Sequence, residues 1–328
     1  SQAVNEALAE EMERDPRVLL IGEDIGRHGG AFGVTKGLWD RFGEKRIYQT
    51  PISEAAIAGA AVGASLVGAR PVAELMYVDF ATIAMDQLVN QGAKVKYMFG
   101  GKARVPMVLR APFGAGRANA GQHSQSLERL FFQIPGLRVA IPSTPADAKG
   151  LLKASIRSAD PVLFIEHKML YNTKGPVPEG EHLVPLGRAD IKREGADLTV
   201  VALSRQVLHA LQAAEQLAAE GISVEVIDPR SLNPFDWETV VRSVRKTGRL
   251  LTVEEGCLTG GVGAEICARV AERCWSDLKA APWRVAGKDV PIPSSPVLEK
   301  LAVPDVREIA TAARSLVREP ALLLNTRP

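Results

Sequence analysis

Two residues of this 328-residue chain, Glu54 and His123, have side chains that could take part in catalysis and lie in sequence settings that could form a ligand site. Glu54 is a lone carboxylate near the start of a stretch of small and apolar residues, TPISEAAIAGAAVGASLVGA. A carboxylate at a helix start can interact with the free backbone N–H groups there. It can also be buried, with a raised pKa, and share a proton with a basic ring nitrogen of a ligand. The residues around Glu54 leave both interpretations open.

His123 lies in GAGRANAGQHSQS, a stretch of small and polar residues without a helix or strand period. Loops that follow the strands of a parallel α/β sheet are where ligands usually bind, and the Gly and Ala residues leave room for one. A purely structural histidine is an equally open interpretation. In AELMYVDF, Met76 and Phe80 are four residues apart, and this spacing alone favours core packing over a cofactor pocket.

Several function classes are disfavoured by composition and spacing. The 40 basic and 38 acidic residues give a net charge of +2 without a long run of like charge, so no nucleic-acid partner is expected. No apolar run is long enough for a membrane helix. The glycine-rich GRHGGAFG and TGGVGAE do not complete a dinucleotide fingerprint, because Ile266 stands where the third Gly or Ala is needed. The cysteines lack the paired spacing of zinc or redox sites, which indicates a reduced compartment and no metal ligand set: Cys257, Cys267 and Cys274.

The elements that must position these residues alternate regularly between helix and strand patterns. Continuous Val, Ile and Leu runs between helical stretches predict parallel sheets covered on both faces. A stretch rich in Pro, Gly and charge at 172–190 interrupts this alternation, which then restarts. The pattern predicts two α/β domains, residues 1–185 and a smaller one at 190–328.

Longer blocks of the sequence resemble a known family. They include GEDIG, TPISEAAIAGAAVGA, RPVAELMYVDF, GQHSQSLE, IDPRSLNPFD and SVRKTGRLLTVEEG, in order along nearly the whole chain. These blocks are similar to those of the beta subunits of thiamine-diphosphate-dependent 2-oxo acid dehydrogenases, which include the pyruvate, acetoin and branched-chain enzymes. The resemblance implies a transketolase-like pyrimidine-binding domain, residues 1–185, followed by a transketolase C-terminal domain, residues 190–328.

The resemblance also implies roles for particular residues. In the family, the glutamate of the TP-[IL]-[SA]-E block binds the aminopyrimidine ring nitrogen of thiamine diphosphate, and Glu54 occupies that position. Met76 and Phe80 match residues that line the aminopyrimidine. His123 matches an active-site histidine that faces the substrate and the lipoyl group. Glu23 matches an acidic residue near the cofactor, so the family likeness favours a buried, proton-sharing Glu54 over a simple helix-start carboxylate.

A missing motif implies a partner. Thiamine enzymes bind Mg²⁺ and the diphosphate through a Gly-Asp-Gly element, whose oxygen ligands suit the hard cation, and this chain has no such element. The family likeness therefore implies an alpha subunit that holds Mg²⁺ and the diphosphate, in an alpha2-beta2 heterotetramer. It implies a lipoyl-bearing acyltransferase as a second partner. A structural monovalent cation, held by backbone carbonyls near 155–160, is a further possibility that the family carries.

The substrate is less well defined. Gln49 stands where the family often has an acidic residue, and Gln122 precedes His123 where branched-chain members often have a second histidine. YMFGGKA and EHKMLY resemble acetoin-type subunits. We predict the beta subunit of pyruvate dehydrogenase, with the acetoin and branched-chain enzymes as alternatives, and with a non-catalytic scaffold or an NAD-binding subunit as weaker ones. The first segment reads as a helix and not as a leader, so we expect a cytoplasmic protein if the source is a prokaryote, with mitochondrial matrix or plastid as alternatives.

Overall fold

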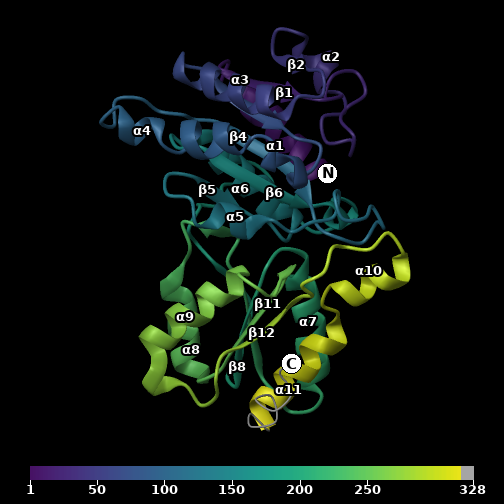
Figure 1. The fold of residues 1–328 in the computed structure, drawn as a ribbon, viewed down its shortest axis with the longest axis vertical. Coiled ribbons are helices and arrows are strands. Elements are labelled where there is room, and N and C mark those ends of the chain that lie inside the picture. Colours follow the sequence, from purple (N-terminus) through teal and green to yellow (C-terminus); the bar gives the residue numbers. More distant parts are fainter. Residues whose placement is uncertain (319–328) are drawn as a thin grey trace. The chain divides into compact units, whose positions relative to one another are not determined.

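A computed structural model describes residues 1–318, and the chain forms two compact units (Figure 1). Within the described residues, the first unit contains 1–114, 130–186 and 231–234, and the second contains 115–129, 187–230 and 235–318. The main passage between the units lies at Leu186 and Gly187. Two short segments are exchanged, since 115–129 belongs to the second unit and 231–234 to the first. The hydrophobic periodicity of the sequence does not reveal this exchange.

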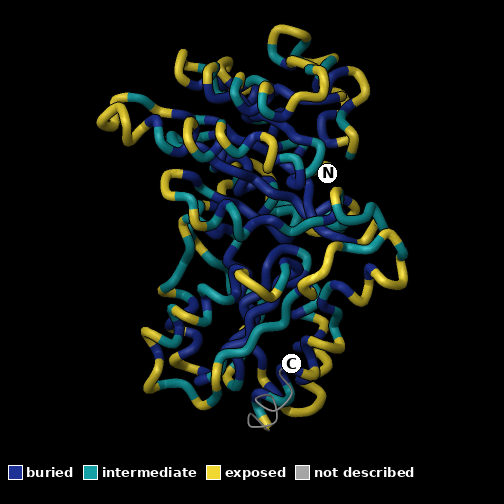
Figure 2. Tube along the Cα trace, viewed as in Figure 1, coloured by how far each residue is buried: buried dark blue, intermediate teal, exposed yellow. Residues whose placement is uncertain are grey.

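The first unit is built on a seven-stranded sheet of order β10-β5-β6-β4-β3-β1-β2. Only the β10–β5 pair is antiparallel. The strands are β1 (Val18–Gly22), β2 (Ile47–Gln49), β3 (Arg70–Glu74), β4 (Val108–Phe113), β5 (Arg138–Ala140), β6 (Val162–His167) and β10 (Ser231–Asn233). β4 and β6 are buried along their whole length, as expected for parallel strands covered on both faces (Figure 2).

The start of helix α6 in the first unit has residue types that favour a helix N-terminus. Thr144 caps the helix α6 by accepting a hydrogen bond from the Asp147 N–H at 3.1 Å, and Pro145 occupies the first turn. α1 packs against α6, and α3 packs on β3. The helices and short turns are α1 (Gln2–Arg14), α2 (Leu38–Phe42), α3 (Glu54–Leu66), η1 (Val78–Thr82), η2 (Gln87–Gly92), α4 (Val95–Met98), α6 (Pro145–Arg157) and η3 (Lys168–Asn172). α5 (Glu128–Phe132) begins in the second unit and ends in the first.

The second unit contains a five-stranded sheet of order β12-β11-β8-β9-β7, in which only β7 runs antiparallel to its neighbour. Its strands are β7 (Asp190–Arg193), β8 (Leu198–Ala202), β9 (Val224–Asp228), β11 (Leu250–Cys257) and β12 (Trp283–Gly287). α7 packs with α11 on one face and α8 packs with α9 on the other (Figure 1). The helices are α7 (Arg205–Ala218), α8 (Trp237–Thr247), α9 (Val262–Cys274), η4 (Trp275–Asp277), α10 (Pro296–Ala302) and α11 (Val306–Arg318).

The predicted fold class is therefore confirmed, since both units are mostly parallel sheets covered by helices. Within residues 1–318, no helix has the length and apolar character needed to cross a membrane.

Candidate active site

The carboxylates of the first unit gather at the carboxyl ends of neighbouring strands. β1 ends at Gly22, which is directly followed by Glu23, and Gly22 pairs in register with Glu74 at the end of β3. Glu54 opens α3, which follows β2, the other neighbour of β1. In open α/β sheets this edge is where ligands bind. The sheet thus positions Glu23, Glu54 and Glu74 at the carboxyl ends of its strands, a typical place for ligand binding. We call these three residues the acidic edge.

Glu23 and Glu54 are buried without protein partners. Each is 7% exposed. Glu23 Oε1 accepts no hydrogen bond from the part of the chain that the structure describes, and the side chain of Glu54 forms no hydrogen bond or ion pair within residues 1–318. Burial raises the pKa of Glu23, and the nearby charges of Glu54, Asp24 and Glu74 raise it further. A buried acceptor without a partner, such as Glu23 Oε1, costs about 1–3 kcal/mol, so this site is suited to a ligand that donates a hydrogen bond or shares a proton.

A buried ion-pair network occupies the neighbouring strand ends. The Arg110 guanidinium on β4 donates to both Glu166 oxygens, from Nε and Nη2, each at 2.7 Å. Its Nη1 donates to Glu74 Oε2 at 2.5 Å, and the Tyr171 hydroxyl donates to Glu166 Oε2 at 2.7 Å. Arg110 therefore forms ion pairs with both Glu74 and Glu166, whereas Glu23 and Glu54 have no such cation. This network is not among the sites predicted from the sequence, although a charged residue in each of three apolar strands is a usable signal.

Apolar side chains lie beside this acidic edge. Met76 follows β3 and Phe80 lies in η1, and both are half-buried. The Tyr77 ring lies between two others, edge-on to Phe80 with centroids 6.1 Å apart and edge-on to Phe32 at 5.8 Å. Met76 and Phe80 are thus half-buried apolar side chains close in sequence to Glu74. The aromatic support from Phe32 was not anticipated from the sequence.

His123 lies in the second unit, within the exchanged loop 115–129. Its side chain is half-buried, its backbone N–H donates to the Ala120 carbonyl at 3.4 Å, and the adjacent Ser124 is buried. Of the five candidate residues, the structure places four on the first unit and His123 on the second.

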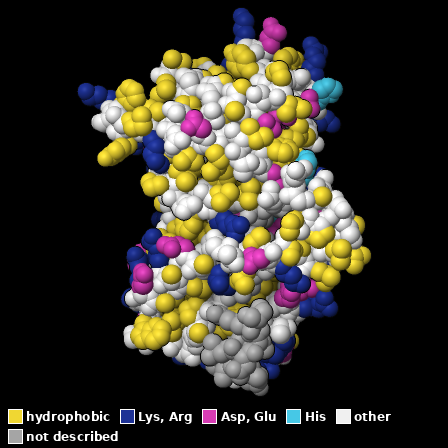
Figure 3. Space-filling model, viewed as in Figure 1, with side chains coloured by type: hydrophobic (Ala, Val, Ile, Leu, Met, Phe, Trp, Pro, Cys, Tyr) yellow, Lys and Arg dark blue, Asp and Glu magenta, His cyan; other side chains and the backbone are white. Residues whose placement is uncertain are grey.

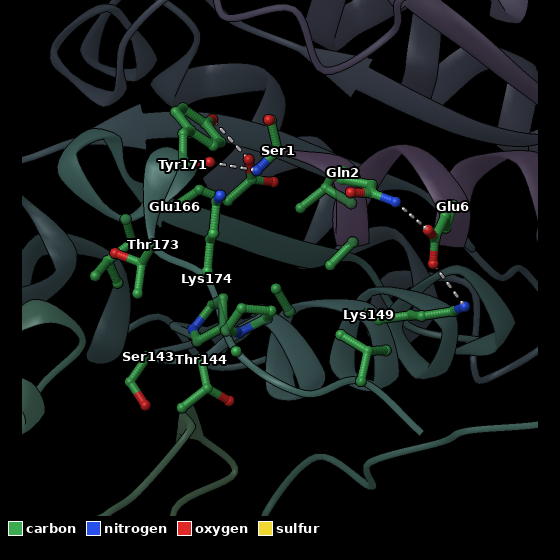
Figure 4. Close-up of a pocket in the computed structure, with 18 of the residues that line it drawn as sticks. Ser1, Gln2, Glu6, Ser143, Thr144, Lys149, Glu166, Tyr171, Thr173 and Lys174 are labelled. Atoms are coloured by element: carbon green, nitrogen blue, oxygen red, sulfur yellow. Dashed lines mark hydrogen bonds and ion pairs between the residues drawn. The ribbon is translucent and has the colours of Figure 1, made fainter. Parts of the chain in front are cut away.

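A separate cavity of ≈ 690 Å³ opens in the first unit, between α1 and residues of 142–179 (Figure 4). Glu166 and Tyr171 line it, and Lys149 Nζ pairs with Glu6 Oε2 across it at 3.0 Å. None of the five candidate residues is among the described residues that line this cavity. Glu166 and Tyr171 of its wall belong to the Arg110 network, which connects the cavity wall to Glu74.

The loop proposed for a cation is already partly satisfied. Arg70 Nη1 donates to the carbonyl oxygens of Ile156 and Ser158 at 2.8 and 3.0 Å. A cation at these carbonyls would share them with a guanidinium. Between residues 1 and 318, no group of three or more His, Cys, Asp or Glu side chains is placed to hold a metal.

Comparison with known domains assigns both units. Residues 1–174 match the transketolase pyrimidine-binding domain, and residues 187–309 match the transketolase C-terminal domain. A solved structure titled "Split gene transketolase, inactive beta4 tetramer" superposes with a TM-score of 0.77 and 26% identity, covering 97% of each chain. A transketolase from Leishmania mexicana has a TM-score of 0.71 at 17% identity, covering 97% of this chain and 45% of that one, and it supports the fold alone.

Relatives that match nearly the whole chain identify a group of proteins within this family. The chain is 48% identical to an acetoin:2,6-dichlorophenolindophenol oxidoreductase subunit beta of Bacillus subtilis, covering 98% of each. It is 46% identical to a 2-oxoisovalerate dehydrogenase subunit beta of the same organism, covering 96% of this chain and 97% of that one. It is 46% identical to a mitochondrial pyruvate dehydrogenase E1 component subunit beta-1 of Arabidopsis thaliana, covering 95% and 87%. The chain therefore belongs to the transketolase-like family, within the group of beta subunits of pyruvate, acetoin and branched-chain 2-oxo acid dehydrogenases.

Proposed function

We propose that this chain is the beta subunit of a pyruvate dehydrogenase and that Glu54 is its proton-sharing carboxylate for thiamine diphosphate. The observation that carries this proposal is the pair Glu23 and Glu54, buried at the ligand-binding edge without a protein partner in the described chain. The transketolase-like family depends on thiamine diphosphate, whose aminopyrimidine ring has a basic nitrogen. Such a ring satisfies the pair in a way that the surrounding protein does not.

The residues present fit an aminopyrimidine. Glu54 would hold a proton between its carboxyl oxygen and the ring nitrogen. Burial and the nearby charge of Glu54 raise the pKa of Glu23, so the two carboxyl groups influence each other. Met76 and Phe80 would contact the ring through apolar surface and exclude water. When bound, thiamine diphosphate supplies the nucleophilic carbon and the electron sink for decarboxylation. His123 is proposed to face the 2-oxo acid and the lipoyl acceptor, where it orients the acyl group or donates a proton.

The proposed active site needs a second chain. Gly-Asp-Gly, the element that thiamine enzymes use for Mg²⁺ and diphosphate, does not occur in this sequence. We therefore infer an alpha subunit that holds the metal and the diphosphate, in an alpha2-beta2 heterotetramer, and a lipoyl-bearing acyltransferase that accepts the acyl group. The relatives are named as beta subunits, which supports such an assembly.

A structural monovalent cation near 155–160 stays part of the proposal in a restricted form. Because Arg70 already donates to Ile156 and Ser158, we expect a cation there to contribute little. Replacing K⁺ by Na⁺ in the buffer should leave the melting temperature unchanged within about 1 °C, on the scale of a few tenths of a kcal/mol for a domain this size.

Acetoin is the second candidate substrate. Two relatives at 48% identity, from Cupriavidus necator and Bacillus subtilis, are named acetoin oxidoreductase beta subunits. The YMFGGKA and EHKMLY blocks point the same way.

Co-expression with an alpha subunit from the same source tests the proposal. We expect the alpha-beta assembly to reduce 2,6-dichlorophenolindophenol with pyruvate faster than with acetoin or a branched 2-oxo acid. Calorimetry should show tight thiamine diphosphate binding with Mg²⁺ to the pair and weak binding to the beta chain alone. Tight binding by the beta chain alone would contradict the shared site, and faster turnover of acetoin would reassign the substrate.

A further inference from the structure

The loop that carries His123 is held by buried carboxylates from distant parts of the second unit. Glu299 on α10 accepts hydrogen bonds from two backbone N–H groups of the loop, Gly116 at 2.8 Å to Oε1 and Ala118 at 2.9 Å to Oε2. Glu255 on β11 accepts from the Ala115 N–H. Glu299 is 4% exposed, so its contacts with the loop amides are shielded from solvent.

The anchored backbone is in a conformation that L residues rarely adopt. Ala118 and Ala120 have φ angles of 54° and 62°, and Gly116 has a φ of 112°. Left-handed backbone at two alanines persists only where the surroundings impose it. The carboxylate of Glu299 bridges the amides of Gly116 and Ala118, so it contacts two of these three residues directly. The side chain is therefore placed to impose the turn that leads to His123.

Helix α10 has an unusual orientation that serves this contact. Its apolar side chains Val297, Leu298 and Leu301 are 71%, 53% and 58% exposed, whereas the charged Glu299 points inward. Figure 3 shows hydrophobic side chains gathered over α10. A surface helix normally buries its apolar side chains and exposes its charges. Burial of a carboxylate is tolerated when it accepts hydrogen bonds, and here its acceptors face the loop amides.

We propose that Glu299 is a positioning residue that fixes the backbone of 115–120 and thereby the imidazole of His123, with Glu255 as a second anchor. The inference rests on the proposed role of His123 in acyl transfer. A carboxylate suits this task because each of its two oxygens accepts one N–H. A glutamine would offer one oxygen to one amide and set its NH₂ group against the other.

Amide hydrogen exchange on the full chain, assembled with its alpha partner, tests the anchor. We expect Glu299→Ala to raise the exchange rates of the Gly116 and Ala118 amides by about 10-fold or more, and Glu299→Gln to raise them less. Lys300→Ala, which changes the exposed neighbour on the same helix, should leave them unchanged. Unchanged exchange in Glu299→Ala would overturn the proposal, and so would an equal effect of Lys300→Ala.

Steady-state kinetics of the same variants test the consequence for His123. Displacement of a catalytic group by about 1 Å can cost up to 10²-fold in rate, so kcat should fall by about 10- to 100-fold in Glu299→Ala. Glu299→Gln should recover part of the loss, and the Kd for thiamine diphosphate should stay the same. Faster exchange with an unchanged kcat would overturn the positioning role. If the wild-type assembly turns over no 2-oxo acid or acetoin, the proposed function fails, and the exchange rates still decide whether Glu299 holds the loop.

Discussion

The two units bury carboxylates in different ways. In the second unit, Glu254 accepts from the N–H groups of Val262 and Gly263 at the start of α9, at 2.9 and 2.8 Å, and Glu299 accepts from a loop. In the first unit, Glu23 and Glu54 accept nothing from the described chain, although they are buried at the edge of the sheet. Burial alone thus does not distinguish a structural carboxylate from one that is available to a ligand. The partners of its oxygens do.

The second unit also contains a buried carboxylate oxygen without a hydrogen bond in the described chain. Glu128 Oε2 is buried without a hydrogen bond in the described chain, beside Glu254. A Cβ placed on Gly256 would lie 3.0 Å from Glu128 Oε1 and 3.5 Å from Glu254 Oε2, so the two carboxyl groups flank one glycine. There is little space beside this pair. We therefore interpret Glu128 as a protonated carboxyl group that shares its proton with Glu254, and not as a ligand-binding residue.

The largest expected effect concerns Glu54. Glu54→Gln keeps the shape of the side chain and removes its proton exchange, so kcat of the alpha-beta assembly should fall by about 10²- to 10⁴-fold. Steady-state rates with pyruvate check this. Glu44→Gln, at an exposed position, should leave the rate unchanged. Undiminished turnover in Glu54→Gln would favour a scaffold role for the chain and would remove the contrast between the two units.

The second largest effect concerns Arg110, whose guanidinium forms an ion pair with Glu74 of the acidic edge. Arg110→Met leaves Glu74 and Glu166 buried without their cation, and removal of one partner from a buried ion pair costs about 3–5 kcal/mol. The melting temperature should fall by about 10 °C. Arg41→Met breaks an exposed ion pair with Glu13 and should cost less than about 1 kcal/mol. An equal loss in both variants would show that the network is no more important than a surface pair.

Much of this architecture follows from the sequence. Continuous apolar runs predict β4 and β6 as buried parallel strands, because covered strands need apolar side chains on both faces. The lone carboxylate in an Ala- and Gly-rich helix identifies Glu54 as a candidate, and the structure places it in the first turn of α3. Local pattern therefore predicts the elements and their types.

The remaining features depend on contacts between residues far apart in the chain. Arg110 and Glu166 are 56 residues apart, and Gly116 and Glu299 are 183 apart, so no local period can indicate either pair. The exchange of loop 115–129 into the second unit has the same origin, since it depends on Glu255 and Glu299. Strand order and long-range pairing decide these contacts, and a single sequence does not specify them by periodicity.

A smaller effect, on pH dependence, tests the interpretation of Glu128. Burial raises the pKa of Glu128 to about 8, and the charges of Glu254 and Glu255 add to this, while Arg129 opposes it. Because its ordinary value is 4.5, the folded chain retains a proton that the unfolded chain loses. This stabilisation is complete below about pH 4.5 and is lost as the pH rises through about 8.

We therefore expect the melting temperature of the wild type to fall between pH 6 and 8.5, and that of Glu128→Gln to fall less. Glu265→Gln, at a surface pair with Arg269, is the matched control and should follow the wild type. Identical slopes in Glu128→Gln and the wild type would mean that Glu128 is ionised in the folded chain.

The smallest expected effect separates Glu23 from Glu128. Burial raises the pKa of Glu23 from its ordinary 4.5, so its contribution to stability is complete below that pH and is lost as the pH rises through the folded-state value. Glu23→Gln should flatten this part of the pH profile, with differences in melting temperature of about 1–3 °C. If Glu23 faces a ligand, the difference between Glu23→Gln and the wild type should change when thiamine diphosphate, Mg²⁺ and the alpha subunit are added. The corresponding difference for Glu128→Gln should stay constant, because the charged groups that act on it, Glu254, Glu255 and Arg129, all belong to the second unit. Thermal melts of both variants between pH 5 and 8, with and without cofactor, measure this, and equal responses of the two carboxyl groups to the cofactor would remove the distinction between them.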